Sequence, residues 1–236
     1  MANEAVINQM AAVKGDVQKE TDAALTALVA LVWPFRSPDF RWEDYPELED
    51  KANEILRGLS DAINADMKAR AASAIAEMAL EEFEEGALEY AESDIAGESP
   101  LFRLDMQGSH LKDLFALWIA LYAASKITSA MARLSFYSFM DTPAARTLKW
   151  GRGYATNVRT GYALIAQDFI NRAFQYARVQ EFKKDGAIGY RTIRNSSYDC
   201  PFCDEMGEQI WPLDVIVLPY HPRCVCSAVP VYSPEE

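Results

Sequence analysis

Apolar residues recur every three or four positions in the N-terminal part of the chain, which is the spacing of one face of an α-helix. These residues are Val6, Met10, Val13, Val17, Ala24, Leu28 and Leu31. Pro34 follows Trp33 and ends the pattern, because proline moves the residue before it out of the α region. The sequence therefore predicts an amphipathic helix that ends near Trp33.

A second long helix is predicted from about Pro46 to Tyr90. Pro46 suits the first turn of a helix, and acidic residues follow it near the positive end of the helix dipole. The loop before it, residues 37–46, is rich in aromatic residues. Such a loop can serve as an exposed docking patch, but proteins seldom expose aromatic clusters, so we expect it to fold back on the helices.

Two more helices follow a break between Gly97 and Gly108. Ser109 is expected to cap a strongly apolar helix that continues to about Met140. The last helix is predicted from about Tyr154 to Lys184. Its apolar face contains Val158, Tyr162, Ile165, Phe169, Ala173 and Tyr176.

The pattern changes after Gly186, where residues alternate as in a short strand over 188–195. Long helices are excluded from the remaining tail by Pro201, Pro212, Pro219, Pro222 and Pro230, and residues 224–229 can form a second strand. The predicted fold is mainly α with a small α+β C-terminal module. We expect a helical body over residues 1–145 and a second region over 146–236, in which the module begins at about residue 186.

The chain has 236 residues, half of them apolar, and this is enough for a large core. Its net charge of −12 argues against a surface that coats nucleic acid. The apolar segments 23–33 and 114–125 are shorter than the ~20 residues needed to cross a bilayer. The first twenty residues lack a secretory pattern. We therefore expect a reducing compartment, in which metal ligands or free thiols are favoured over disulfides.

Charge is distributed unevenly along the chain. Residues 71–98 contain nine acids and no Lys or Arg. Residues 146–194 contain ten bases and three acids, a net charge of +7. The asymmetry can reflect an internal complement, a contact between subunits, a DNA-facing patch or solvated helix faces. The bases proposed to face a partner or DNA are Arg146, Lys149, Arg152, Arg159, Arg172, Arg178, Lys183 and Lys184.

All four cysteines and one of the two histidines lie in the tail. Cys200 and Cys203 form a C-x2-C pair, and after seventeen intervening residues His221 and Cys224 form an H-x2-C pair. Thiolates and an imidazole at these spacings can bind one tetrahedral zinc ion as a Cys3His site. Cys226 is a fifth candidate ligand, so the sequence leaves the choice of four ligands open.

The cysteines can also have roles that involve no metal. They can be small buried residues in a reduced core, or they can form disulfides after release from the cell. If a metal is bound, a closed set of four ligands favours a structural ion, whereas Asp204 and Glu205 leave a catalytic ion possible. No phosphate-binding loop, nucleophile elbow or zinc-protease motif is present. The other histidine, His110, is expected on the surface in the first turn of a helix.

The tail resembles the C-terminal signature of the bacteriophage Mu F-like minor head (head morphogenesis) proteins. The resemblance rests on the segment from Tyr198 to Gly207, on Trp211, Asp214 and Pro219, and on the His221–Cys226 ending. The helix before the tail, with Thr156, Asn157, Arg159 and Ala163, is also similar to the family's helical lead-in. It covers roughly residues 150–232. One residue departs from the family pattern, because Val225 stands where the family usually has Arg between the last two cysteines.

This resemblance implies a virion component of a tailed phage or prophage. Such a minor capsid protein would associate with the portal or the major capsid protein, as an oligomer in the particle, and would act in head assembly or genome delivery. It would be located in the virion head, and in the host cytoplasm during assembly. Packaged DNA could contact the basic segment 146–194. The expectation is a structural protein without enzymatic activity and without a membrane partner.

Two other functions remain open. The chain could be a metal-dependent hydrolase, a nuclease or a toxin-like enzyme that uses the Cys/His site, which requires an open metal position. It could also be a zinc-module adaptor with no role in a virion. Residues 1–145 are not assigned by the resemblance.

Overall fold

The structure, a computed structural model, describes residues 4–93, 99–126, 128–140, 158–195, 199–221 and 224–233. It confirms a mainly helical chain with a small antiparallel sheet near the C-terminus. The α-helices are α1 Glu4–Val32, α2 Pro46–Ala76, α3 Glu84–Glu92, α4 Pro100–Tyr122, α5 Ser129–Met140, α7 Val158–Lys184 and α8 Pro201–Gly207. The strands are β1 Gly189–Ile193 and β2 Ser227–Val231.

The chain divides into two compact units. The first unit contains Met1–Lys14, Ala65–Pro100 and Leu164–Glu236. The second contains Gly15–Asn64 and Leu101–Ala163. The first unit therefore joins segments from both sides of the position at which the sequence suggested a boundary, residue 145. Helices α1, α2 and α7 each contribute residues to both units.

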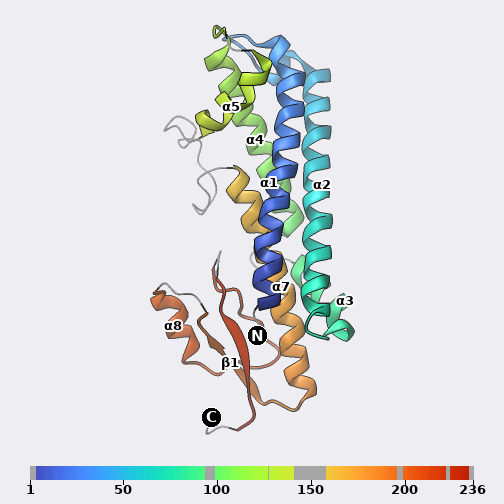
Figure 1. The fold of residues 1–236 in the computed structure, drawn as a ribbon, viewed down its shortest axis with the longest axis vertical. Helices are drawn as coiled ribbons and strands as arrows, with labels where there is room; N and C mark the ends of the chain where they lie inside the picture. Colours follow the sequence, from blue (N-terminus) through green and yellow to red (C-terminus); the bar gives the residue numbers. More distant parts are fainter. Residues whose placement is uncertain are drawn as a thin grey trace. The chain divides into compact units, whose positions relative to one another are not determined.

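Helices α1 and α2 lie side by side (Figure 1). The apolar stripe predicted for α1 is buried except at Leu31, which is half-buried: Val6, Val13, Val17 and Leu28 are each at most 1% exposed. Burial of such side chains contributes roughly 1.5–3 kcal/mol each. The burial of this side of α1 therefore follows from the three- and four-residue spacing of these residues.

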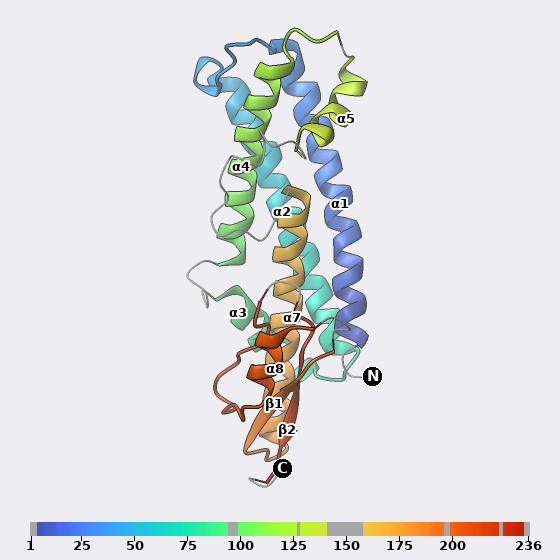
Figure 2. The ribbon, with the colours of Figure 1, turned by 90° about the vertical axis from the view of Figure 1, so that its left-hand side faces the viewer.

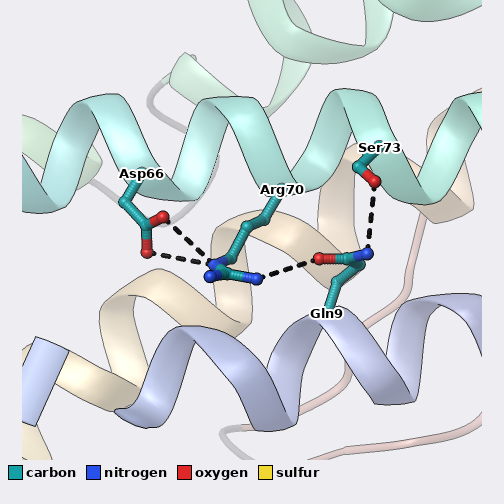
Figure 3. A network of polar contacts seen from close by, with 4 residues as sticks. All are labelled: Gln9, Asp66, Arg70 and Ser73. Atoms are coloured by element: carbon teal, nitrogen blue, oxygen red, sulfur yellow. Dashed lines mark hydrogen bonds and ion pairs between the residues drawn. The ribbon is translucent and has the colours of Figure 1, made fainter. Parts of the chain in front are cut away.

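A polar network joins α1 to α2 within the first unit (Figure 3). Arg70 Nε donates to both carboxylate oxygens of Asp66, at 3.1 and 3.2 Å. Arg70 Nη1 donates to Gln9 Oε1 at 3.1 Å, and Gln9 Nε2 donates to Ser73 Oγ at 3.2 Å. Because Gln9 presents its acceptor to one residue of α2 and its donor to another, the network fixes how the two helices are aligned.

The helix predicted over residues 46–90 is interrupted, so that prediction was wrong for residues 77–83. Ala79 adopts a φ of 55°, in the left-handed region. The N–H of Leu80 then bonds the carbonyl of Ile75 at 3.1 Å, which is the closing bond of a helix C-terminus. Glycine usually occupies this position, and the sequence has alanine. A 3-10 turn, η3 Glu81–Phe83, and then α3 continue the chain.

The break predicted over residues 97–108 was also misplaced. Helix α4 begins at Pro100, and Ser109 lies within it, where its hydroxyl donates to Asp105 O at 3.1 Å. Gly108 is buried, and a Cβ there would lie 3.5 Å from both Leu56 and Tyr162 Oη. This glycine allows close helix packing rather than ending the helix. The helix predicted to reach Met140 is divided into α4 and α5.

Aromatic residues form the core of the second unit. The rings of Trp33 and Trp118 lie 5.2 Å apart, and Phe115 packs against Phe136 at 4.8 Å. The aromatic loop folds back as expected. Its Trp42 is 6% exposed and donates Nε1–H to Lys112 O at 3.2 Å, which ties the loop to α4.

Helix α7 has few exposed positions along the part that lies in the first unit. Ile165, Phe169 and Ala173 of its predicted apolar face are buried, and Tyr176 stacks on Tyr90 at 4.7 Å. Strands β1 and β2 pair with Gly189 opposite Val231 and lie beside the C-terminal end of α7 (Figure 2). Val179 and Phe182 of α7 pack against buried residues of the module.

Candidate metal centre

Helix α8 positions the C-x2-C pair. Cys200 is the residue before its first turn, and Pro201 occupies the position where its missing N–H costs no hydrogen bond. The Cys200 carbonyl accepts the N–H of Asp204 at 3.0 Å, so the turn closes around the pair. Cys200 is half-buried and Cys203 is buried. The pair therefore lies at the start of a short helix.

Tyrosine hydroxyls hold the loop that carries His221. Tyr190 Oη donates to Val215 O at 2.7 Å and accepts the N–H of Val217 at 3.0 Å. Tyr90 Oη donates to Ile216 O at 3.0 Å. Because three consecutive residues, 215–217, are bonded this way, the loop has a defined path before it reaches His221.

The five predicted donors converge in the first unit. His221 Nε2 lies 3.1 Å from Cys203 Sγ and 3.4 Å from Cys200 Sγ. The donor atoms of these three residues lie within 4.8 Å of one another. The thiols of Cys203, Cys224 and Cys226 form a second triad with the same limit. Cys203 belongs to both triads and is buried, so it is the centre of the donor set.

The thiols differ in their affinity for protons. The backbone N–H of Cys203 bonds the sulfur of Cys200 and lowers the pKa of Cys200. Burial raises the pKa of Cys203 to about 12. A hydrogen bond from the Cys226 thiol lowers the pKa of Cys224 to about 5 and raises that of Cys226. The pKa is therefore lowered for Cys200 and Cys224 and raised for Cys203 and Cys226. A metal cation among these sulfurs would lower the pKa of each thiol and favour the thiolate.

This donor set fits a metal ion. Sulfur and imidazole donors suit zinc and other ions of the soft or borderline class, with four ligands in a tetrahedron. The described residues supply two triads of such donors within metal-binding distance. The tail can therefore hold a metal, as the spacing of the cysteines and His221 predicted.

Two buried carboxamides contribute to this site and were missed in the sequence. Asn171 and Gln175, one turn apart on α7, are 2% and 0% exposed. Their amide groups donate to the backbone carbonyls of Cys224 at 2.8 Å and of Cys226 at 3.3 Å. The available signal was two amides four residues apart within an apolar helix.

The acidic residues considered for catalysis lie at the surface. Asp204 is exposed and its carboxylate lies 3.3 Å from Arg194 Nε, while Arg194 also pairs with Asp199. Glu205 is exposed. The structure thus places an ion pair, Arg194 with Asp204, beside the first turn of α8.

His110 is not at a helix start, which corrects the sequence prediction. It lies inside α4 and is half-buried, and burial lowers its pKa while Asp113 acts in the opposite direction. Helix α4 begins at Pro100 and not after Ser109, which moves His110 from the first turn to the middle of the helix. It belongs to the second unit, whereas the Cys/His donors belong to the first.

Most of the described bases of the basic segment lie on α7, and only some of their side chains are exposed. Arg178 is 8% exposed, with its guanidinium 5.4 Å from the ring of Phe182, so it does not face DNA as proposed. Arg172 pairs with Asp168 at 2.9 Å, both 12% exposed. The sequence gives the charges of Arg172 and Arg178 but does not show which elements cover α7. The prediction that these two residues face DNA failed for this reason.

The other proposed bases have different positions. Lys183 and Lys184 are exposed at the end of α7, and Lys184 Nζ lies 2.5 Å from the carboxylate of Glu82 in the acidic segment. This contact is one internal complement between the two oppositely charged segments. Arg159 lies in the first turn of α7. Arg146, Lys149 and Arg152 lie outside the described residues.

Comparisons with known proteins give no relative: no family model matches the chain, and no curated protein or solved structure matches it either. In the described part of the chain, every helix is too short or too polar to cross a membrane.

Proposed function

We propose that the C-terminal module binds one structural zinc ion through four of its five Cys/His donors. The observation that carries this proposal is the convergence of the two donor triads on Cys203. Zinc prefers four sulfur and nitrogen ligands and stabilises modules with small cores of their own. The two-stranded sheet and the seven-residue α8 form such a module.

We further propose that the chain is a minor structural protein of a tailed-phage head, associated with the portal or the capsid interior. The support is the order of residues in the tail, C-P-x-C followed by H-P-x-C-x-C, as in the Mu F-like minor head proteins. In that order, the residues with metal-binding side chains are the ones that meet in space. The role proposed is in head assembly or genome delivery, with the metal centre holding the tail in shape.

Contact with packaged DNA is the part of this proposal that involves the basic segment. Among the described bases, Lys183 is exposed and suited to phosphate contact, whereas Lys184 would have to leave its ion pair with Glu82 to reach a phosphate. Such binding should weaken steeply with added salt, because each neutralised phosphate releases counterions. Retention on DNA that does not change with salt would assign these lysines to protein contacts instead.

Two measurements test the proposal. Elemental analysis of the purified full chain should give one zinc per chain, and a chelator that removes it should expose residues 186–233 to protease. Quantitative mass spectrometry of purified particles should then find the chain at a fixed ratio to the portal protein. Absence from particles would contradict the head-protein role, and DNA cleavage by the zinc-loaded chain would favour the nuclease alternative.

A further inference from the structure

Three consecutive backbone carbonyls at the second cysteine pair are each bonded by a side-chain amide. They belong to residues 224–226. Asn171 Nδ2 lies 2.8 Å from the first carbonyl oxygen, Asn195 Nδ2 lies 3.1 Å from the second, and Gln175 Nε2 lies 3.3 Å from the third. The segment that carries two candidate metal ligands is therefore held at every peptide unit.

The two amides of α7 form a closed network. Gln175 Nε2 also donates to Asn171 Oδ1 at 3.1 Å, and Gln175 Oε1 accepts the N–H of Ala228 at 3.2 Å. The nitrogen of the Gln175 side chain thus donates to a backbone carbonyl, and its oxygen accepts from a backbone N–H. A carboxylate of the same shape could accept the backbone N–H but could not donate to the carbonyl, so the site requires a carboxamide.

These bonds have few substitutes. Residues 224–226 precede β2, so the strand pairing with β1 does not include them. Cys224 and Cys226 are 1% and 2% exposed, which keeps water from replacing a lost donor. If the amides are removed, the peptide units must therefore rotate or remain unsatisfied, and either change moves the thiols.

We propose that Asn171, Gln175 and Asn195 are positioning residues of the metal centre. They orient the backbone of residues 224–226 so that the thiols of this segment are placed for metal binding before the ion arrives. This inference rests on the proposed metal-binding function. Groups that orient metal ligands typically change metal affinity by about 10–100-fold when they are replaced.

The test measures binding of Co²⁺ by the metal-free full chain, using the thiolate–cobalt absorption band in competition with a chelator. Asn171→Asp and Gln175→Glu keep the shape and remove the donor. Each should weaken Co²⁺ binding by about 10–100-fold and shift the cobalt spectrum. The matched control is Gln167→Glu on the same helix, because Gln167 donates to Met10 O at 2.8 Å, away from the cysteines. The control should bind Co²⁺ like the wild type.

Asn195→Ala gives a measurement that does not depend on a buried substitution, since Asn195 is exposed. It should weaken Co²⁺ binding by a smaller factor, with unchanged helix content. If Asn195→Ala and the α7 variants all bind Co²⁺ as tightly as Gln167→Glu, the positioning role is overturned and the metal site stands. If the wild type binds neither Co²⁺ nor Zn²⁺, the metal site and the positioning role fail together.

Discussion

The imidazole Nε2 of His221 lies 3.1 Å from the sulfur of Cys203, although eighteen positions separate the two residues in the chain. One partner is on the first turn of α8, and the other follows a loop held by tyrosine hydroxyls. Their approach depends on both elements packing on α7 and the sheet. The relationship is therefore a product of the folded module, and substitutions in the module should disturb it in predictable ways.

Cys203→Ser should have the largest effect of any single ligand substitution, because Cys203 belongs to both donor triads. Structural zinc contributes about 10–16 kcal/mol to the folding of small zinc modules, so loss of the shared ligand should remove much of this stabilisation. Limited proteolysis should cut residues 186–233 while the helices stay intact. Phe202→Ser is the control, since Phe202 is 50% exposed and has no donor atom for the metal. Equal protease resistance of the two variants would contradict a metal that holds the module.

The Gln9–Arg70 hydrogen bond should couple α1 to α2. Each residue is polar and only partly buried, so Gln9→Ala or Arg70→Ala should lower the free energy of unfolding by about 0.5–1.5 kcal/mol. A double-mutant cycle measured by urea unfolding should give a coupling energy of about 0.5–1 kcal/mol. Additive effects would mean that the network of Figure 3 does not hold the two helices together.

The stability of the chain should fall in mild acid, partly through His110. Burial lowers the pKa of His110 below the usual value near 6.5, so the unfolded chain binds this proton more readily than the folded chain. The stabilisation of the folded state is therefore complete above the unfolded-state value and is lost as the pH falls below it. His110→Gln should flatten this part of the pH profile of unfolding.

The contribution of His221 is separated by comparing His110→Gln with the wild type under identical metal loading. Both proteins contain His221, so its titration cancels in the difference. A difference in unfolding free energy that is constant between pH 5 and 7.5 would contradict the role assigned to the burial of His110.

Gly189→Ala should destabilise the C-terminal module. A Cβ at Gly189 would lie 2.8 Å from Ile210 Cγ2 and 2.9 Å from the backbone oxygen of Trp211, which accepts a hydrogen bond from Tyr190. We expect a loss of about 1–3 kcal/mol, measured by thermal unfolding. Gly15→Ala is the control in α1, where nothing lies within 4 Å, and it should raise stability by about 0.5–1 kcal/mol. A neutral Gly189→Ala would show that the loop at Ile210 can move aside.

The sequence determined the class of the fold and the chemistry of the site. Three- and four-residue spacing defined α1 and most of α7, because the side that a helix buries repeats along its own sequence. Residue type alone identified the sulfur and imidazole donors. The end of α2 at Ala76 was not predictable in this way, since the left-handed residue that follows it, Ala79, is not a glycine.

Only the tertiary structure decided which polar residues of α7 face inward. Asn171, Gln175 and Arg178 have the composition of a solvent-facing helix surface, yet all are buried because the C-terminal module and other elements cover that surface. Local sequence encodes periodicity and ligand type, whereas the meeting of Cys203 with His221 depends on packing between elements distant in the chain. The C-x2-C and H-x2-C spacing indicated which residues could meet, and the closure of the whole module decided which of them do and at what distance.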